Sequence, residues 1–201
     1  MKITELAVPG AWRCVPDVHH DDRGEFLEWF RADLVGEAAG RRFDVAQANH
    51  SVSDRGVVRG VHFADTPPGQ SKVVYCVEGE AIDVIVDLRV GSPTYGQHDS
   101  VLLNAVDRQV VVIAEGLGHA FCATRDRTSL AYLVSAPYNP EVEHTVSPLD
   151  PELGLPWPLP ADELRLSPRD AAAPTLEQAR AAGVLPSYDA CQAWYAERAV
   201  V

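Results

Sequence analysis

The feature that most constrains the fold is a regular succession of short β-type segments between residues 44 and 136. Segments rich in β-branched and aromatic residues recur at intervals of roughly ten residues, and turn residues rather than helical patterns separate them. Such a pattern indicates an all-β sandwich or barrel. The expected strands are DVAQANHSV (44–52), VVRGVHF (57–63), KVVYCV (72–77), AIDVIVDLR (81–89), QHDSVLLN (97–104), RQVVVIAEG (108–116), HAFCAT (119–124) and SLAYLVSA (129–136).

The segments before residue 44 are more varied. ITELAV (3–8) alternates like an edge strand, HDDRG (20–24) has turn chemistry, and RADLVGEAAGRRF (31–43) predicts a short helix that ends near Gly40. EFLEWF (25–30) predicts a strand with Phe26, Glu28 and Phe30 on one face.

The composition changes after Leu149, where DPELGLPWPLP (150–160) predicts a rigid, proline-punctuated loop. PTLEQARAAG (174–183) and SYDACQAWYAER (187–198) have helical spacing, and Ser187 is a plausible N-cap. The 201 residues, of which 46% are apolar, suit one domain. We expect a barrel over residues 1–148 and a proline-rich loop with a helical segment over residues 149–201.

Charge limits the classes of partner. A net charge of −12 and a pI near 4.9 argue against nucleic-acid and membrane-surface partners, which need a basic face. An anionic small ligand would need a local cationic cluster, which Arg23, Arg59 and Lys72 could form. No apolar run approaches the roughly 18 residues of a membrane span, and the N-terminus lacks a signal-peptide pattern, so we expect a cytoplasmic protein. The cysteines lack metal-type spacing and are expected to be buried free thiols: Cys14, Cys76, Cys122 and Cys191.

Four residues are candidates for chemistry. His62 suits general-base work if a carboxylate fixes its tautomer, although a strand histidine is more often structural. Tyr132 could serve as an acid or simply pack in the core. Lys72 could stabilise an oxyanion or lie on a solvated face. Asp170, in LSPRD, is by itself a loop or cap residue.

Metal and phosphate-loop chemistry have little support in the sequence. Small β-barrels often hold a metal through a His-x-His pair, but Gly60 stands two residues before His62. His19 and His20 point to opposite faces if extended, and the remaining histidines stand apart: His50, His98 and His144. G-x-S-x-G, G-x-G-x-x-G and G-x-x-x-x-G-K are absent, so the sequence does not support the hydrolases and nucleotide-binding folds that carry them. We expect neither metal nor cofactor.

Eight motifs together resemble, in order and spacing, the dTDP-4-dehydrorhamnose 3,5-epimerase family over about residues 3 to 186. The resemblance implies a metal-free cupin-type jelly-roll barrel, a homodimer and a dTDP-4-keto-6-deoxyhexose substrate. The motifs are DDRGEFLEWF (21–30), QANHSVSDRGVVRGVHF (47–63), PPGQSKVV (67–74), DVIVDLRVGSPTYG (83–96), EGLGHAF (115–121), AYLVSAPYNPEVEH (131–144), DPELGLPWP (150–158) and LSPRDAAAPTL (166–176).

The resemblance also implies roles for individual residues. His62 matches the family's base, Asp170 its orienting carboxylate, Lys72 the group near the C4 oxygen and Tyr132 the acid on the opposite ring face. Phe26 and Tyr138 resemble aromatics that sandwich the thymine. The other positions that match nucleotide- or sugar-binding residues are Arg23, Glu28, Gln47, Asn49, Arg59, His119, Glu143 and Arg169.

Three departures from the family pattern put the regiochemistry in doubt. Ala120 follows the histidine where glycine is more common, Ala114 replaces a common proline, and FADTPP (63–68) differs from the usual aromatic-Gln start of its loop. We expect these changes to lie close to the sugar pocket. Epimerisation at both C3 and C5 is the leading hypothesis. The alternatives are a mono-epimerase for C3 or C5 in antibiotic deoxysugar biosynthesis, a ketoisomerase that moves the carbonyl from C4 to C3, and a non-catalytic sugar-nucleotide-binding barrel.

Overall fold

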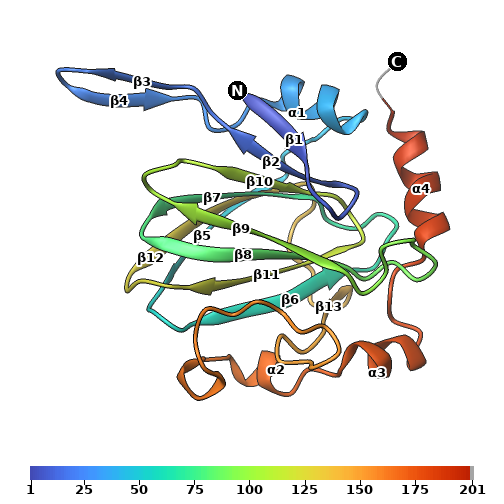
Figure 1. Ribbon diagram of the computed structural model, residues 1–201. Helices are drawn as coiled ribbons and strands as arrows, with labels where there is room; N and C mark the ends of the chain where they lie inside the picture. The colour runs from blue at the N-terminus through green and yellow to red at the C-terminus, as the bar shows by residue number, and fades with distance from the viewer. Residues whose placement is uncertain (200–201) are drawn as a thin grey trace.

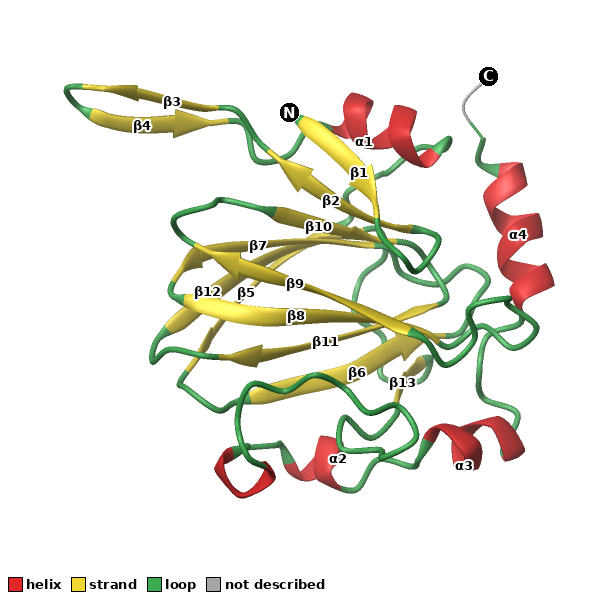
Figure 2. Cartoon of the chain, viewed as in Figure 1, coloured by secondary structure: helices red, strands yellow, loops and turns green. Residues whose placement is uncertain are grey.

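Two antiparallel β-sheets pack face to face in the computed structural model, which describes residues 1–199 (Figures 1 and 2). The six-stranded sheet has the order β1 (Lys2–Glu5), β2 (Ala11–Val15), β10 (Val110–Ile113), β7 (Lys72–Glu78), β12 (Thr128–Val134) and β5 (Gln47–Ser53). The five-stranded sheet has the order β13 (Glu143–Thr145), β6 (Val58–Ala64), β11 (Leu117–Ala123), β8 (Glu80–Asp87) and β9 (His98–Asn104). This arrangement confirms the predicted all-β jelly-roll barrel, and every strand expected between residues 44 and 136 is present.

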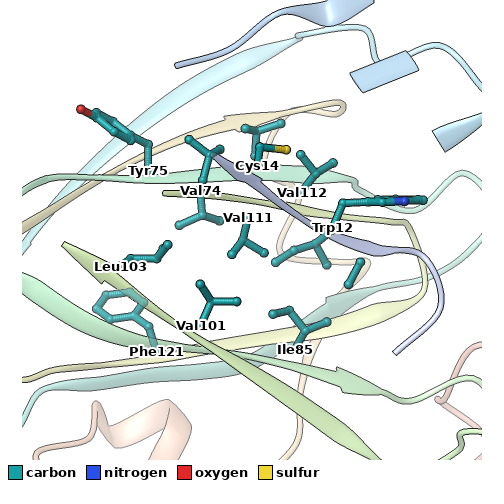
Figure 3. Packing of buried hydrophobic residues seen from close by; sticks show 14 of the residues in the cluster. Trp12, Cys14, Val74, Tyr75, Ile85, Val101, Leu103, Val111, Val112 and Phe121 are labelled. Carbon is teal, nitrogen blue, oxygen red and sulfur yellow. The ribbon is translucent and has the colours of Figure 1, made fainter. Parts of the chain in front are cut away.

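The main core lies between the two sheets, where β-branched residues from both inner faces interdigitate (Figure 3). Val74 and Val111 of the six-stranded sheet pack in the same cluster as Ile85, Leu103 and Phe121 of the five-stranded sheet, and each is at most 2% exposed. Burial of this apolar surface is the main term that holds the sheets together.

The C-terminal segment up to Leu185 covers the outer face of the five-stranded sheet, whereas the last helix packs beside one end of the barrel, where Tyr195 donates a hydrogen bond to the backbone carbonyl of Glu115. Val61 and Val86 point outward and pack on Leu153, Leu155 and Leu176 in a second apolar cluster. The segment contains a short 3₁₀ turn (Ala161–Glu163), α2 (Pro168–Ala171), α3 (Leu176–Ala181) and α4 (Tyr188–Glu197), as Figure 1 shows. The helices expected from sequence are therefore confirmed, including the Ser187 cap, whose side chain accepts a hydrogen bond from the backbone of Ala190.

The N-terminal region differs from the expectation. β3 (Val18–Asp21) and β4 (Gly24–Leu27) form a hairpin that projects away from the two sheets (Figure 1), so the expected strand over 25–30 was wrong beyond Leu27. Trp29 stacks on Tyr75 of β7, with ring centroids 5.0 Å apart, and this contact turns the chain back onto the barrel. α1 (Ala32–Ala39) follows and ends at Gly40 with φ of 66°, as predicted.

A bulge in β6 sets the geometry of the pocket. Opposite β11, His119 pairs with His62 whereas Phe121 pairs with Arg59, so β6 has one residue more than its partner. The extra residue interrupts the alternation of faces, and Arg59 and His62 both project into the barrel although they are three residues apart. Gly60 lies at this bulge with φ of 117°.

Candidate active site

One end of the barrel interior is an open cavity of about 170 Å³. Its lining includes eight of the residues that the sequence predicted for the site: Asn49, Arg59, His62, Lys72, His119, Tyr132, Tyr138 and Glu143. Gln70, Phe121 and Val134 complete the wall, and sequence reasoning missed them. Residues from both sheets therefore converge on one concave, partly apolar site, which is typical of a small-molecule pocket.

His62 and Asp170 form a hydrogen-bonded pair at the pocket wall. Nε2 of His62 donates to Oδ1 of Asp170 over 2.8 Å, and Asp170 is only 3% exposed. With its proton held on Nε2, the ring presents the lone pair of Nδ1. Burial lowers the pKa of His62, while the bond to Asp170 opposes that shift. The arrangement supplies a neutral imidazole of fixed tautomer, as a general base requires.

A one-turn helix positions Asp170. The hydroxyl of Ser167 accepts a hydrogen bond from the backbone of Asp170 over 3.1 Å, and Pro168 occupies the first helical position of α2. Burial alone would raise the pKa of Asp170, but the hydrogen bond from His62 holds it below its ordinary value. The carboxylate therefore stays ionised behind the imidazole.

Lys72 stands at the start of β7, where Val134 of β12 pairs with it. Burial lowers the pKa of Lys72, and the negative charges of Glu143 and Asp83 oppose the shift. A cation in such an enclosed setting interacts strongly with a developing negative charge, because little water screens it.

Tyr132 projects into the same cavity from β12. Its hydroxyl is 2.6 Å from the hydroxyl of Ser51, and its ring packs edge-on against His119 with centroids 6.4 Å apart. Burial raises the pKa of Tyr132 to about 12. The phenol is therefore protonated at neutral pH and can act as an acid rather than a base.

A second histidine–carboxylate pair lies beside the first. Nε2 of His119 donates to Oδ2 of Asp83 over 2.7 Å, and Asp83 is fully buried. Oδ1 of Asp83 has no hydrogen-bond partner among the described residues. Sequence reasoning missed Asp83, although a charged residue inside the apolar run of β8 was a signal, because buried carboxylates need a partner.

Polar residues at the rim hold one another in place. Nε of Arg59 donates to the hydroxyl of Ser53 over 3.1 Å, and Nε2 of Gln47 donates to Oδ1 of Asn49 over 2.5 Å. Oε1 of Gln47 accepts from the backbone of Tyr138 over 3.2 Å. These contacts place Gln47 beside the pocket that Asn49, Arg59 and Tyr138 line.

Arg169 lies just outside the pocket. Its Nη2 donates to the backbone carbonyl of Glu143 over 2.8 Å, and Arg169 lines an adjacent groove rather than the pocket itself.

Three predicted binding residues lie away from this pocket in the same chain. Phe26 on the projecting hairpin is 66% exposed. Arg23 forms an ion pair with Asp21, and its side chain is 84% exposed. The side chain of Glu28 is 60% exposed and pairs with Arg31. The structure therefore does not bring Arg23, Phe26 and Glu28 to the pocket of their own chain.

The departures noted in the sequence lie in different places. Neither Ala120 nor Ala114 lines the pocket itself, but Ala120 lies in β11 between His119 and Phe121, which do. Ala120 faces the outer cluster with Val61, because successive residues of β11 alternate between faces, and Ala114 is buried in the main core. Residues of the FADTPP segment line a neighbouring cavity that shares Gln70, Tyr138 and Glu143 with the pocket.

Over residues 1–199, no group of three or more histidine, cysteine, aspartate or glutamate side chains is arranged to hold a metal ion. Within the same residues, no helix combines the length and the apolarity that crossing a membrane requires. All four cysteines are free and buried.

Comparisons with known proteins give a consistent result. Residues 5–178 match the family model described as dTDP-4-dehydrorhamnose 3,5-epimerase. A dTDP-4-dehydrorhamnose 3,5-epimerase from Mycolicibacterium smegmatis is 55% identical over 96% of this chain and 95% of its own length. A dTDP-4-dehydrorhamnose 3-epimerase from Streptomyces niveus is 52% identical over 96% of this chain and 92% of its own. The solved structure of the RmlC epimerase of Mycobacterium tuberculosis matches with a TM-score of 0.96 and 49% identity, covering 98% of this chain and 100% of that one.

Proposed function

The chain belongs to the dTDP-4-dehydrorhamnose 3,5-epimerase family, and from this premise we propose that it is an isomerase that inverts C3 and C5 of a dTDP-4-keto-6-deoxyhexose. The observation that carries the proposal is the pocket itself, where a carboxylate-fixed imidazole, a buried ammonium and a protonated phenol line one cavity. Inverting a carbon next to a ketone needs a base to remove a proton, a cation near the ketone oxygen and an acid to return a proton. The imidazole, the ammonium and the phenol supply these three groups.

His62 removes the proton. C3 and C5 both flank the C4 ketone, so loss of a proton from either carbon gives an enolate whose charge lies on the C4 oxygen. Nδ1 of His62 accepts the proton, and the carboxylate of Asp170 stabilises the imidazolium that forms.

Lys72 and Tyr132 complete the inversion. The ammonium of Lys72 stabilises the enolate oxygen, because a cation preorganised in an enclosed pocket has little water to displace. The phenol of Tyr132 returns a proton to the carbon from the face opposite His62, which inverts the centre. Its high pKa keeps the proton in place until the enolate forms.

The remaining pocket residues bind the nucleotide sugar. The planar guanidinium of Arg59 suits the diphosphate, since it can donate two parallel hydrogen bonds to phosphate oxygens. Tyr138 is 54% exposed at the rim and offers a face for the thymine. Polar side chains around the opening orient the sugar and phosphates: Gln47, Asn49, His119, Glu143 and Arg169.

We propose that the working unit is a homodimer in which each hairpin completes the pocket of the partner. The cavity of about 170 Å³ is smaller than the roughly 300–1,000 Å³ of pockets that enclose a small molecule. The projecting hairpin carries an exposed aromatic residue, Phe26, and an exposed arginine, Arg23, which suit a thymine and a phosphate. Glu28, just beyond the hairpin, would bind with them.

A complementation experiment tests this dimer. Phe26→Ala and His62→Asn variants should each turn over poorly, and mixing them through reversible unfolding should restore activity. Restoration follows because a mixed dimer contains one pocket with both native residues. Failure of mixed samples to exceed the sum of the two variants would refute contribution from the partner.

Inversion at a single carbon is the second candidate function. The chain is 52% identical to a 3-epimerase and 55% identical to a 3,5-epimerase, so sequence identity does not distinguish inversion at one carbon from inversion at two. We further propose that the protein acts in the cytoplasm without a metal or cofactor. Four free thiols support a reducing compartment.

Proton NMR in D2O tests the proposed function. The purified protein is incubated with dTDP-4-keto-6-deoxyglucose, deuterium is followed at C3 and C5, and the product is identified. Deuterium and inversion at both carbons is the expected result. Exchange at one carbon would establish the mono-epimerase, migration of the keto group would indicate a ketoisomerase, and binding without exchange would indicate a non-catalytic barrel.

A further inference from the structure

The proposed inversion creates a proton imbalance inside the pocket. Each inversion leaves His62 protonated and Tyr132 as a phenolate, because one residue takes the proton and the other supplies it. Before the next inversion, His62 must lose a proton and Tyr132 must regain one. The bound sugar fills the cavity between them, so the phenol needs a route to solvent that does not pass through the substrate.

Ser51 occupies the position that such a route requires. Its hydroxyl lies 2.6 Å from the hydroxyl of Tyr132, a short distance for a hydrogen bond between two hydroxyl groups. Ser51 belongs to β5, the last strand of the six-stranded sheet, and its side chain is half-buried. It therefore lies between the partly buried phenol of Tyr132 and the edge of the sheet.

The strand pairing keeps the two hydroxyl groups together. Tyr132 pairs with Asn49 and Leu130 pairs with Ser51, so Tyr132 and Ser51 are diagonal neighbours on one face. Two residues further along β5, Ser53 accepts a hydrogen bond from Arg59. One row of β5 side chains thus supports two pocket residues that the proposed function uses.

The same contact stabilises the charged product of the proton transfer. Burial raises the pKa of Tyr132, and the hydrogen bond from Ser51 opposes that shift, because a hydroxyl that donates to a phenolate favours the anion. The Ser51 hydroxyl can therefore hydrogen-bond both the phenol of Tyr132 and the phenolate that remains after Tyr132 gives up its proton.

We propose that Ser51 is a positioning residue that acts through Tyr132 as its proton relay to solvent. Ser51 passes its hydroxyl proton to the phenolate oxygen and takes a replacement from a water molecule. The hydroxide that remains is neutralised by the proton that His62 releases, so the cycle leaves no net change. This inference rests on the proposed function, since it assigns Tyr132 the role of acid.

An isosteric pair of variants tests the relay. Ser51→Val removes the hydroxyl and fills its space so that water cannot substitute, whereas Ser51→Thr keeps the hydroxyl on a side chain of the same shape. With dTDP-4-keto-6-deoxyglucose, rapid-quench kinetics separate the first inversion from all later ones. Ser51→Val should slow each later inversion at least about tenfold more than it slows the first, because only the later inversions need the phenolate to regain its proton. Ser51→Thr should behave as the wild type.

Each other outcome overturns the relay. Equal slowing of the first and later inversions by Ser51→Val would mean that Ser51 only supports the phenol. Unchanged kinetics in both variants would mean that Tyr132 is reprotonated by another route. If the wild-type protein shows neither exchange nor inversion, the proposed function fails and the relay fails with it, and this control distinguishes the two failures. Circular dichroism of both variants verifies that they are folded.

Discussion

Replacing Gly60 by alanine should disrupt the bulge that aims Arg59 and His62 into the pocket. A Cβ atom at this position would lie 2.4 Å from the carbonyl oxygen of His119 and 2.7 Å from Ala120, inside the 3.0 Å that real Cβ contacts keep. The obstacle is backbone, so β6 and β11 must separate. The φ of 117° at Gly60 adds strain for any residue with a side chain.

The expected cost follows from these two effects. Backbone strain contributes about 1–3 kcal/mol, and overpacking against β11 contributes about 1–3 kcal/mol more. Gly60→Ala should therefore lower the free energy of unfolding by about 2–6 kcal/mol. Turnover should fall by up to about 100-fold, because an error near 1 Å in the placement of a catalytic group costs about that much.

A matched control separates strain from collision. Gly183, which is outside both the hairpin and the pocket, has a φ of 70° and nothing within 4 Å of a built Cβ, so substituting alanine there measures the cost of a positive φ alone. Urea unfolding of both variants gives the two free energies, and NMR of the substrate gives turnover. Wild-type stability and turnover in Gly60→Ala, or equal losses of stability in the two variants, would refute the role assigned to the bulge.

Four further outcomes are expected. Tyr132→Phe should reduce inversion by about 100-fold or more while His62 still exchanges substrate protons with D2O; unchanged inversion would remove Tyr132 from the role of acid. Because the base must be neutral and burial lowers the pKa of His62 below its ordinary 6.5, kcat/KM should decline only as pH falls below that value. Asp170→Asn should move this decline to still lower pH, since the carboxylate raises the pKa of His62, and a shift to higher pH would contradict the assignment. Extended dialysis against EDTA should leave turnover unchanged, and a loss restored by a divalent metal would show that the reaction needs one.

Local chemistry explains why much of the fold was predictable. Strands such as KVVYCV and SLAYLVSA contain β-branched and aromatic residues at the density that a half-buried sheet favours, and they form β7 and β12. Ser187 and Gly40 bound helices by capping, which depends on a few adjacent residues. The strand predicted for EFLEWF (25–30) ends early, at Leu27, because Trp29 stacks on Tyr75. Tyr75 is distant in the sequence, so the alternation within the segment does not reveal this contact.

The amino-acid sequence by itself determined the all-β architecture, the family resemblance and the identity of most pocket residues, because these depend on local pattern and on ordered motifs. Tertiary structure alone decided which faces those residues occupy. Strict alternation along β6 would have put Arg59 and His62 on opposite sides of the sheet, and only pairing with β11 reveals the bulge that unites them. The roles of Asp83 and Ser51 also follow only from the tertiary structure. In the fold, Asp83 of β8 hydrogen-bonds His119, and Ser51 of β5 hydrogen-bonds Tyr132. Hydrogen bonds between distant segments produce no periodic pattern in a sequence.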